Sequence, residues 1–279
     1  MRRGCRFASV DGMTGQPVRI LIVGGGYVGM YTALGLQKKL SRGAAEITLV
    51  EPQSNMTYQP FLPEAAAGSV EPRHVVVPLR KVLRHCTVLS GAVTRVEHAA
   101  KRVTVQPVQG EAYRRDYDLL VMCPGSISRL LPIPGLAENG IGFKTIGEAI
   151  YLRNHVLSQL DLAASTDDPE QRRRALTFVF VGGGYAGVEA MAELEDMARY
   201  ATRYIDNVEP SDMRWVLVEA ASRIMPEVSV RLSAYTVDRL TERAIDVRLN
   251  TRLESAEGGR IVLSDGEQFD ADTLVWTAG

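Results

Sequence analysis

The sequence predicts an α/β protein with two domains, each built on a parallel sheet. An apolar strand runs into a glycine-rich turn at Leu21–Gly29 and again at Val179–Gly187. An Ala/Leu-rich run, typical of a helix, follows each turn. Each helix leads to a second apolar strand, which ends on Glu51 in the first copy and on Glu219 in the second. Strand, glycine turn, helix and acid-terminated strand form the βαβ unit of Rossmann-like, dinucleotide-binding domains.

Composition limits the classes of function. The 279 residues are 46% hydrophobic and 23% charged with a net charge of −1, which is typical of a globular protein of two domains and does not indicate a nucleic-acid partner. The three cysteines, Cys5, Cys86 and Cys123, are far apart, so they predict neither a disulfide framework nor a redox pair, and they fit a reducing compartment. No run approaches the roughly 18–20 apolar residues of a membrane span, so we expect any membrane contact to be peripheral.

The first glycine turn has the G-x-G-x-x-G spacing at Gly24, Gly26 and Gly29. The first glycine allows a tight turn, the second allows a pyrophosphate to approach the backbone, and the third allows the helix to pack closely on the strand. The phosphates would then lie at a helix N-terminus, where unpaired N–H groups favour anions. Glu51, at the end of the next strand, is placed to accept hydrogen bonds from ribose hydroxyls.

The second turn repeats the spacing at Gly182, Gly184 and Gly187, and its strand ends on Glu219. A carboxylate at this position repels a 2′-phosphate, so we expect NAD(H) to be preferred over NADP(H), although Arg223 could weaken that preference. We expect the helix of this unit at residues 188–204, with Glu189 in its first turn.

The remaining elements of the first domain are expected as follows. Residues 58–64 contain two prolines and should form a loop before a short helix, either lining a ligand or packing in the core. A small antiparallel meander is expected over 93–106, and residues 118–122 should return to the parallel sheet, closed by Cys123-Pro-Gly. Cys123 fits a small residue at a tight turn better than a reactive thiol.

The second domain should begin after an extended stretch at 130–135 and a helix at 145–164. His155 on this helix is interpreted as a packed or surface residue rather than a catalyst, and residues 166–174 as a solvated charged loop in which three arginines increase solubility. Further elements are expected as a helix at 229–244, a hairpin across Ser264-Asp-Gly266 and a last strand at 273–276. The expected boundaries are a disordered leader at 1–17, an incomplete first domain at 18–130, a linker and helix at 131–165, and a second domain at 166–279.

Taken together, residues 18–279 resemble the two-dinucleotide flavoprotein reductases related to glutathione reductase. They are most similar to the type II NADH dehydrogenases, the single-subunit NADH:quinone oxidoreductases. The most specific matches are Val181–Leu194, the inserted residues 200–210, and Trp215-Val-Leu-Val-Glu-Ala. The absence of paired cysteines separates the chain from disulfide reductases and from sulfide:quinone oxidoreductases.

The resemblance implies two cofactors, FAD in the first domain and NAD(H) in the second. The residues that it implies for FAD are Gly24, Gly26, Tyr27, Gly29, Glu51, Val93, Pro124 and Gly125. For NADH it implies Gly182, Gly184, Gly187 and Glu219. It matches Glu189 to a glutamate near the contact of nicotinamide and flavin that assists proton transfer, although an acid at a helix start has an equally good structural explanation. No metal site is implied.

The activity implied is hydride transfer from NADH to the flavin and delivery of two electrons to a quinone in a respiratory chain. Members of the family continue well past the Thr-Ala-Gly ending, so we expect this chain to be a fragment or a truncated form, lacking the part that would contact the membrane. Two alternatives stay open, a reductase of a protein such as ferredoxin and an NAD(H)-binding module without turnover. A homodimer at the cytoplasmic face of the plasma membrane is also compatible with the resemblance.

Overall fold

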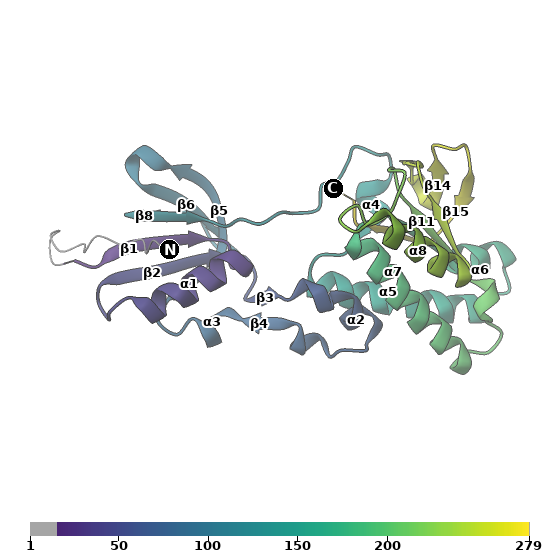
Figure 1. Cartoon of the computed structure of the whole chain (residues 1–279), viewed down its shortest axis with the longest axis horizontal. Coiled ribbons are helices and arrows are strands. Elements are labelled where there is room, and N and C mark those ends of the chain that lie inside the picture. Colours follow the sequence, from purple (N-terminus) through teal and green to yellow (C-terminus); the bar gives the residue numbers. More distant parts are fainter. Residues whose placement is uncertain (1–15, 279) are drawn as a thin grey trace. The chain divides into compact units, whose positions relative to one another are not determined.

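The computed structural model describes residues 16–278, which form two compact units (Figure 1). Unit 1 consists of residues 16–56 and 77–125, and unit 2 of residues 57–76 and 126–278. The chain therefore crosses between the units three times, and residues 57–76 belong to unit 2, whereas the sequence predicted them in the first domain. The expected leader lies outside the described residues, apart from its last two.

Unit 1 is built on a six-stranded sheet with the order β7-β6-β5-β2-β1-β8. Its four strands β5, β2, β1 and β8 run parallel, and β6 and β7 add the antiparallel meander. The strands are β1 (Val18–Val23), β2 (Ala45–Glu51), β5 (Thr87–Glu97), β6 (Arg102–Pro107), β7 (Tyr113–Asp116) and β8 (Leu119–Met122). The helices are α1 (Tyr27–Lys39) and α3 (Leu79–Val82), and the short strands β3 (Asn55–Thr57) and β4 (Val76–Pro78) pair where the chain crosses between units.

The apolar run at residues 20–23 of β1 is explained by burial on both faces of the sheet. Because successive side chains of a strand alternate, Ile20 and Ile22 pack in the core beside Met30 of α1. Leu21 lies in the opposite core, with Val105 of the meander. The register of β1 with β8 confirms the predicted return of residues 118–122 to the parallel sheet.

Unit 2 is built on a five-stranded, all-parallel sheet with the order β12-β11-β10-β16-β9. These strands are β9 (Gly140–Gly142), β10 (Thr177–Val181), β11 (Arg214–Val218), β12 (Ile245–Arg248) and β16 (Thr273–Trp276). A second, antiparallel sheet consists of β13 (Leu253–Ser255), β14 (Arg260–Leu263) and β15 (Gln268–Asp270). The helices are α2 (Leu62–Ala67), α4 (Leu136–Asn139), α5 (Ile146–Ser165), α6 (Pro169–Ala175), α7 (Tyr185–Ala201) and α8 (Val230–Glu242).

The five residues of β10 are all buried, because layers cover both faces of the sheet. Phe178 and Phe180 pack toward the helices α5 and α7, and Phe178 stacks on Trp215 with 4.3 Å between ring centroids. Val179 and Val181 pack toward the small antiparallel sheet. Helix α2 belongs to the helical layer (Figure 1), since its residues Leu62 and Ala66 share the core of α5 and α7.

Residues 166–174 are not the expected charged loop. Residues 169–175 form helix α6, because Asp168 caps its N-terminus by accepting from Glu170 N at 2.9 Å and proline occupies the first helical position. All three arginines have partners in the structure, and Arg173 lies 3.6 Å from the carboxylate of Glu170. Arg172 donates to the carbonyl of Ala163 at 2.6 Å, and Arg174 pairs with Asp272 at 2.8 Å.

Two other boundaries differ from the sequence prediction. Strand β5 runs without a break over Thr87–Glu97 and contains a bulge, so the strand that enters the meander begins six residues before the expected residue 93. Helix α7 begins at Tyr185, three residues before the expected start, because Gly184 is its N-cap. The hairpin across residues 264–266 and the last parallel strand are confirmed.

Candidate functional site

The first glycine turn lies at the end of β1, at the carboxyl edge of the parallel strands of unit 1. Gly24 has a φ of +99°, and a Cβ on it would lie 1.9 Å from the carbonyl oxygen of Cys123. A Cβ on Gly29 would lie 1.8 Å from the carbonyl oxygen of Gly24. Only glycine fits at these two positions. A Cβ on Gly26, by contrast, would meet no heavy atom within 4 Å, so this side of the turn is open to a ligand.

The carboxylate of Glu51 returns to this turn from the end of β2. Its Oε2 accepts from the backbone N–H of Gly25 at 2.6 Å, and its Oε1 accepts from the N–H of Gln53 at 3.0 Å. A carboxylate offers about four acceptor positions, so the half-buried Glu51 retains capacity for ribose hydroxyls. We use the term glutamate latch for this contact, in which the glutamate carboxylate accepts a hydrogen bond from the N–H of the middle glycine of the turn.

The second turn repeats the geometry in unit 2. Gly182 has a φ of +116°, and a Cβ on it would lie 2.6 Å from Oγ1 of Thr277. A Cβ on Gly187 would lie 2.0 Å from the carbonyl oxygen of Gly182, whereas a Cβ on Gly184 would meet nothing within 4 Å. In both turns, neighbouring atoms therefore leave no room for a side chain at the first and third glycines, whereas the space beside the second glycine is free for a ligand.

Unit 2 also has a glutamate latch. Glu219 accepts from Gly183 N at 2.6 Å through Oε2 and from Ala221 N at 2.6 Å through Oε1. Arg223, which the sequence placed near enough to modify this site, donates instead to the carbonyl oxygens of Val228 at 3.2 Å and Pro226 at 2.5 Å. Its guanidinium group is therefore held by its own loop.

The strand beside each turn ends in the same way. The N–H of Cys123 donates to the carbonyl of Val23 at 2.7 Å, and the N–H of Thr277 donates to that of Val181 at 2.9 Å. Gly125, which follows Pro124 after Cys123, has a φ of +67°. Burial raises the pKa of the Cys123 thiol, so the thiolate is disfavoured and Cys123 contributes its backbone to the turn.

Both turns lead into helices that suit an anion. Gly26 and Gly184 are the N-caps of α1 and α7, and neither cap receives a side-chain hydrogen bond. The first turns of the two helices contain no acidic residue. Unpaired N–H groups and the positive end of the helix dipole therefore face the open side of each turn. This arrangement fits the pyrophosphate of a dinucleotide, with the glutamate placed for a ribose.

The other predicted site residues lie as follows. Tyr27 is the first residue of α1. Val93 pairs with Val105 beside the bulge of β5, a strand of the same sheet as Glu51. The structure thus brings Glu51, Pro124 and Gly125 to the strand ends around the Gly24 turn, whereas Val93 lies on the part of β5 that pairs with the meander.

Glu189 lies in the second turn of α7, so the sequence prediction of a first-turn acid is wrong. Burial is the largest of the effects that raise the pKa of its carboxyl group, followed by the charges of Glu64 and Glu193. Glu64 comes from α2, which packs on α7 in the same unit. Its Oε2 is buried and has no hydrogen-bond partner among residues 16–278. The charges of Glu64 and Glu193 therefore add to burial in disfavouring the ionisation of Glu189.

His155 is a packed residue, the first of the two positions that the sequence left open. Its Nε2 lies 3.0 Å from Oγ1 of Thr273 and 3.2 Å from the carbonyl oxygen of Asp272, and burial lowers its pKa. It connects α5 to the first residue of β16, at the opposite end of that strand from the Gly182 turn.

The middle glycines, Gly25 and Gly183, were not among the predicted site residues. A Cβ on Gly25 would lie 2.8 Å from Cγ of Glu51, and one on Gly183 would lie 3.0 Å from Oε2 of Glu219. The glutamate latch therefore requires a third glycine in each turn. The sequence contains a signal for this third glycine. Both turns read Gly-Gly-Gly, whereas the G-x-G-x-x-G motif requires glycine at only two of these three positions.

Comparison with known proteins gives the family. The sequence profile of the pyridine nucleotide-disulphide oxidoreductases matches residues 18–279. The chain belongs to this family. Its predicted fold class, an α/β protein with two Rossmann-like domains and antiparallel insertions, is confirmed by that match and by the two parallel sheets. Within residues 16–278, no helix combines the length and the apolar character needed to cross a bilayer.

Among members of the pyridine nucleotide-disulphide oxidoreductase family, the chain is similar to type II NADH dehydrogenases. It is 30% identical over 280 residues to the type II NADH:quinone oxidoreductase Ndh of Mycobacterium tuberculosis. The aligned region covers 95% of this chain and 59% of that protein. It is 32% identical over 260 residues to the mitochondrial external NADH-ubiquinone oxidoreductase 2 of Saccharomyces cerevisiae, covering 88% of this chain and 48% of that one. The structure of NDH2 from Plasmodium falciparum in complex with NADH has the same fold, with a TM-score of 0.88 at 19% identity over 95% of this chain and 55% of that one. The chain thus spans about half the length of the relatives that it matches.

Proposed function

We propose that this chain forms the dinucleotide-binding part of an FAD-dependent oxidoreductase that accepts hydride from NADH and passes two electrons to a quinone. The observation that carries the proposal is the duplication of one cradle, a glycine turn with a glutamate latch, at the ends of two parallel sheets in one chain. A protein that binds a single dinucleotide needs only one such cradle. The named activities of the relatives support the choice of NADH and quinone.

The Gly24 turn is assigned to FAD. Gly26 would admit the pyrophosphate, and Glu51 would accept from a ribose of the ADP half. The backbone around Pro124 and Gly125 would lie near the rest of the cofactor, since it borders the same turn. Tyr27, Gly29 and Val93 complete the residues proposed for FAD.

The Gly182 turn is assigned to NADH. Gly184 would admit the pyrophosphate, and Glu219 would select a ribose that bears two hydroxyl groups rather than a 2′-phosphate. Glu189, on the following helix, would hold a proton near neutral pH more readily than an exposed glutamate does, because its pKa is raised. When bound, the two cofactors would supply hydride transfer and electron delivery, and the protein would position them.

The spectrum of the purified chain tests the proposal. We expect a flavin absorbance near about 450 nm that NADH bleaches in the absence of oxygen and that a soluble quinone restores. NADPH should bleach it more slowly than NADH. A Glu219→Ala variant should keep the colour but need more NADH for bleaching. A colourless protein that still binds NADH would overturn the oxidoreductase proposal and favour a binding module, and reoxidation by ferredoxin but not by quinone would change the acceptor.

Under this proposal, the partners are NADH and a quinone-type acceptor. The same proposal also predicts a homodimer, a position at the cytoplasmic face of the plasma membrane, and a membrane contact made by further sequence. Gel filtration and fractionation of cells that produce the natural protein would test them.

A further inference from the structure

Two exposed tyrosines lie side by side where helix α7 ends. Beyond α7 the helical backbone continues as one 3-10 turn, η4 (Thr202–Tyr204), so Tyr200 and Tyr204 are four residues apart on the same side of the helix. Their phenolic oxygens are 3.1 Å apart, and their ring centroids are 5.6 Å apart with 57° between the ring planes. The two rings therefore meet at their hydroxyl ends.

The other side of this helix end is fixed in the core of unit 2. Ala198 is buried, and Ala201 and Ile205 pack against the same core. The hydroxyl of Thr202 donates to the carbonyl of Arg199 at 2.9 Å, which supports the turn. The backbone that carries the two tyrosines is therefore held in place, although their rings lie outside the core.

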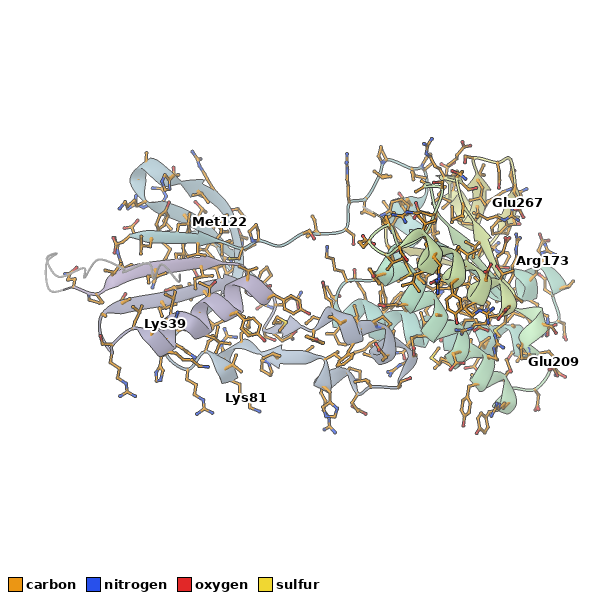
Figure 2. The ribbon with its side chains drawn as sticks, viewed as in Figure 1. Lys39, Lys81, Met122, Arg173, Glu209 and Glu267 are labelled. Atoms are coloured by element: carbon orange, nitrogen blue, oxygen red, sulfur yellow. The ribbon has the colours of Figure 1, made fainter. Side chains whose placement is uncertain are left out.

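Both rings are accessible to solvent. Tyr200 is 54% exposed and Tyr204 is 75% exposed. Glu209, further along the same segment, also lies at the surface of unit 2 (Figure 2). An oxidant in solution can therefore reach both phenols.

The contact between the hydroxyl groups also brings two reactive carbons together. A tyrosine that loses one electron and one proton becomes a radical, with unpaired electron density on the carbons ortho to the hydroxyl group. Because each ortho carbon is bonded to the carbon that bears the hydroxyl, the 3.1 Å contact between the oxygens places ortho carbons of Tyr200 and Tyr204 near one another. From this geometry we infer that Tyr200 and Tyr204 form an oxidative cross-linking site, at which hydrogen peroxide and a haem peroxidase produce dityrosine within one chain.

The reaction balances with peroxide as the oxidant. Each phenol gives up one electron and one proton, and hydrogen peroxide accepts two of each to form two water molecules. The two radicals form a carbon–carbon bond between their ortho carbons, and the hydrogen on each coupled carbon then moves to the oxygen of its own ring. The product would join η4 covalently to the last turn of α7. This inference goes beyond the proposed oxidoreductase and does not depend on it.

Peptide mapping of the oxidised full chain tests the inference. Trypsin cleaves after Arg199, Arg203 and Arg214, so Tyr200 and Tyr204 enter different peptides. After treatment with peroxide and peroxidase, we expect these two peptides to be joined, with a mass two hydrogens below their sum. The oxidised chain should keep the size of a monomer on a denaturing gel and emit the blue fluorescence of dityrosine.

Phenylalanine variants distinguish this pair from other exposed tyrosines. Tyr200→Phe and Tyr204→Phe should each abolish the joined peptides, since each keeps the ring but removes the phenol that forms the radical. The matched control is Tyr235→Phe. Tyr235 is 55% exposed and has the guanidinium of Arg239 5.2 Å from its ring centroid, but its ring contacts no other tyrosine among residues 16–278. This variant should give as much of the joined peptides as the parent.

Three results would overturn the inference. The first is a parent chain whose oxidation leaves the two peptides separate, and the second is joined peptides that occur only in covalent dimers. The third is equal loss in the Tyr200→Phe and Tyr235→Phe variants. Circular dichroism checks that the variants keep the fold, which we expect because both substituted rings are exposed.

Discussion

The backbone N–H of Gly25 donates to Oε2 of Glu51 at 2.6 Å, and unit 2 repeats this contact between Gly183 and Glu219 at the same distance. The carboxylate that is placed for a ribose therefore also fixes the shape of the glycine turn. In each unit, folding of the turn and recognition of the ligand depend on one side chain.

Removing the Glu51 carboxylate should destabilise unit 1 even without a ligand. Glu51→Ala removes two hydrogen bonds to backbone N–H groups, and we expect a loss of about 1–3 kcal/mol in the free energy of unfolding. Glu51→Gln keeps one acceptor oxygen and should lose less. Urea denaturation followed by circular dichroism measures the difference, and equal stability of the alanine variant and the parent would contradict the role of the latch.

Alanine should have opposite consequences at the first and second glycines of a turn. Gly24→Ala would place a Cβ against the Cys123 carbonyl in a left-handed backbone region, so unit 1 should lose at least about 2 kcal/mol of stability. Gly26→Ala meets no atom and has an ordinary φ of −68°, so its melting temperature should stay within about 2 °C of the parent. It should nevertheless bind flavin more weakly, because the methyl group occupies the open side. A Gly26→Ala protein that unfolds would refute this distinction.

Glu219 should determine the choice between NADH and NADPH. Glu219→Ala should weaken NADH binding about tenfold or more and leave NADPH binding nearly unchanged, since the acceptor for ribose hydroxyls and the repulsion of a 2′-phosphate disappear together. Isothermal titration gives both affinities. Arg223→Ala is the control, because its guanidinium group is held by the carbonyls of Pro226 and Val228 and should not affect the ratio.

The acidic group on α7 should make stability depend on pH. Because the pKa of Glu189 is raised above its ordinary value of 4.5, its ionisation costs stability above that pH. Glu189→Gln should therefore raise the melting temperature at pH 7 by about 1–3 °C and have no effect below pH 4.5.

Asp118 provides a test of the opposite sign in unit 1. A hydrogen bond from Arg19 lowers the pKa of Asp118 to about 2, so its charged form is stabilised above its usual pKa and that stability is lost as the pH falls toward 2. Asp118→Asn should lower the melting temperature at pH 7, and the difference from the parent should shrink below pH 4. Scanning calorimetry of the Glu189→Gln and Asp118→Asn variants at pH 7 and below pH 4 measures both effects. If the melting temperatures of the two variants depended on pH in the same way, the assignments would be contradicted.

Local sequence patterns were sufficient for the strands and for the glycine turns. The buried runs at 20–23 and 178–181 predict parallel strands because every residue in them is apolar, whatever its partners are. Helix α6 could not be predicted in the same way, since its residues are mostly charged and its stability comes from the Asp168 cap and from partners such as Asp212 and Asp272 that are distant in sequence. The proximity of Glu64 to Glu189 was equally inaccessible, because it depends on α2 packing on a helix more than a hundred residues later.

Helix α2 has a consequence for how these units can be exchanged. Leu62 and Ala66 complete the core around α7, yet the gene encodes them between two segments of unit 1. A chimera that replaces residues 126–278 with the corresponding region of a relative would pack a foreign α7 against the resident α2. We therefore expect such a chimera to fold when residues 57–76 are replaced together with that region. Each unit is compact by itself, but the segments that encode the two units alternate along the gene.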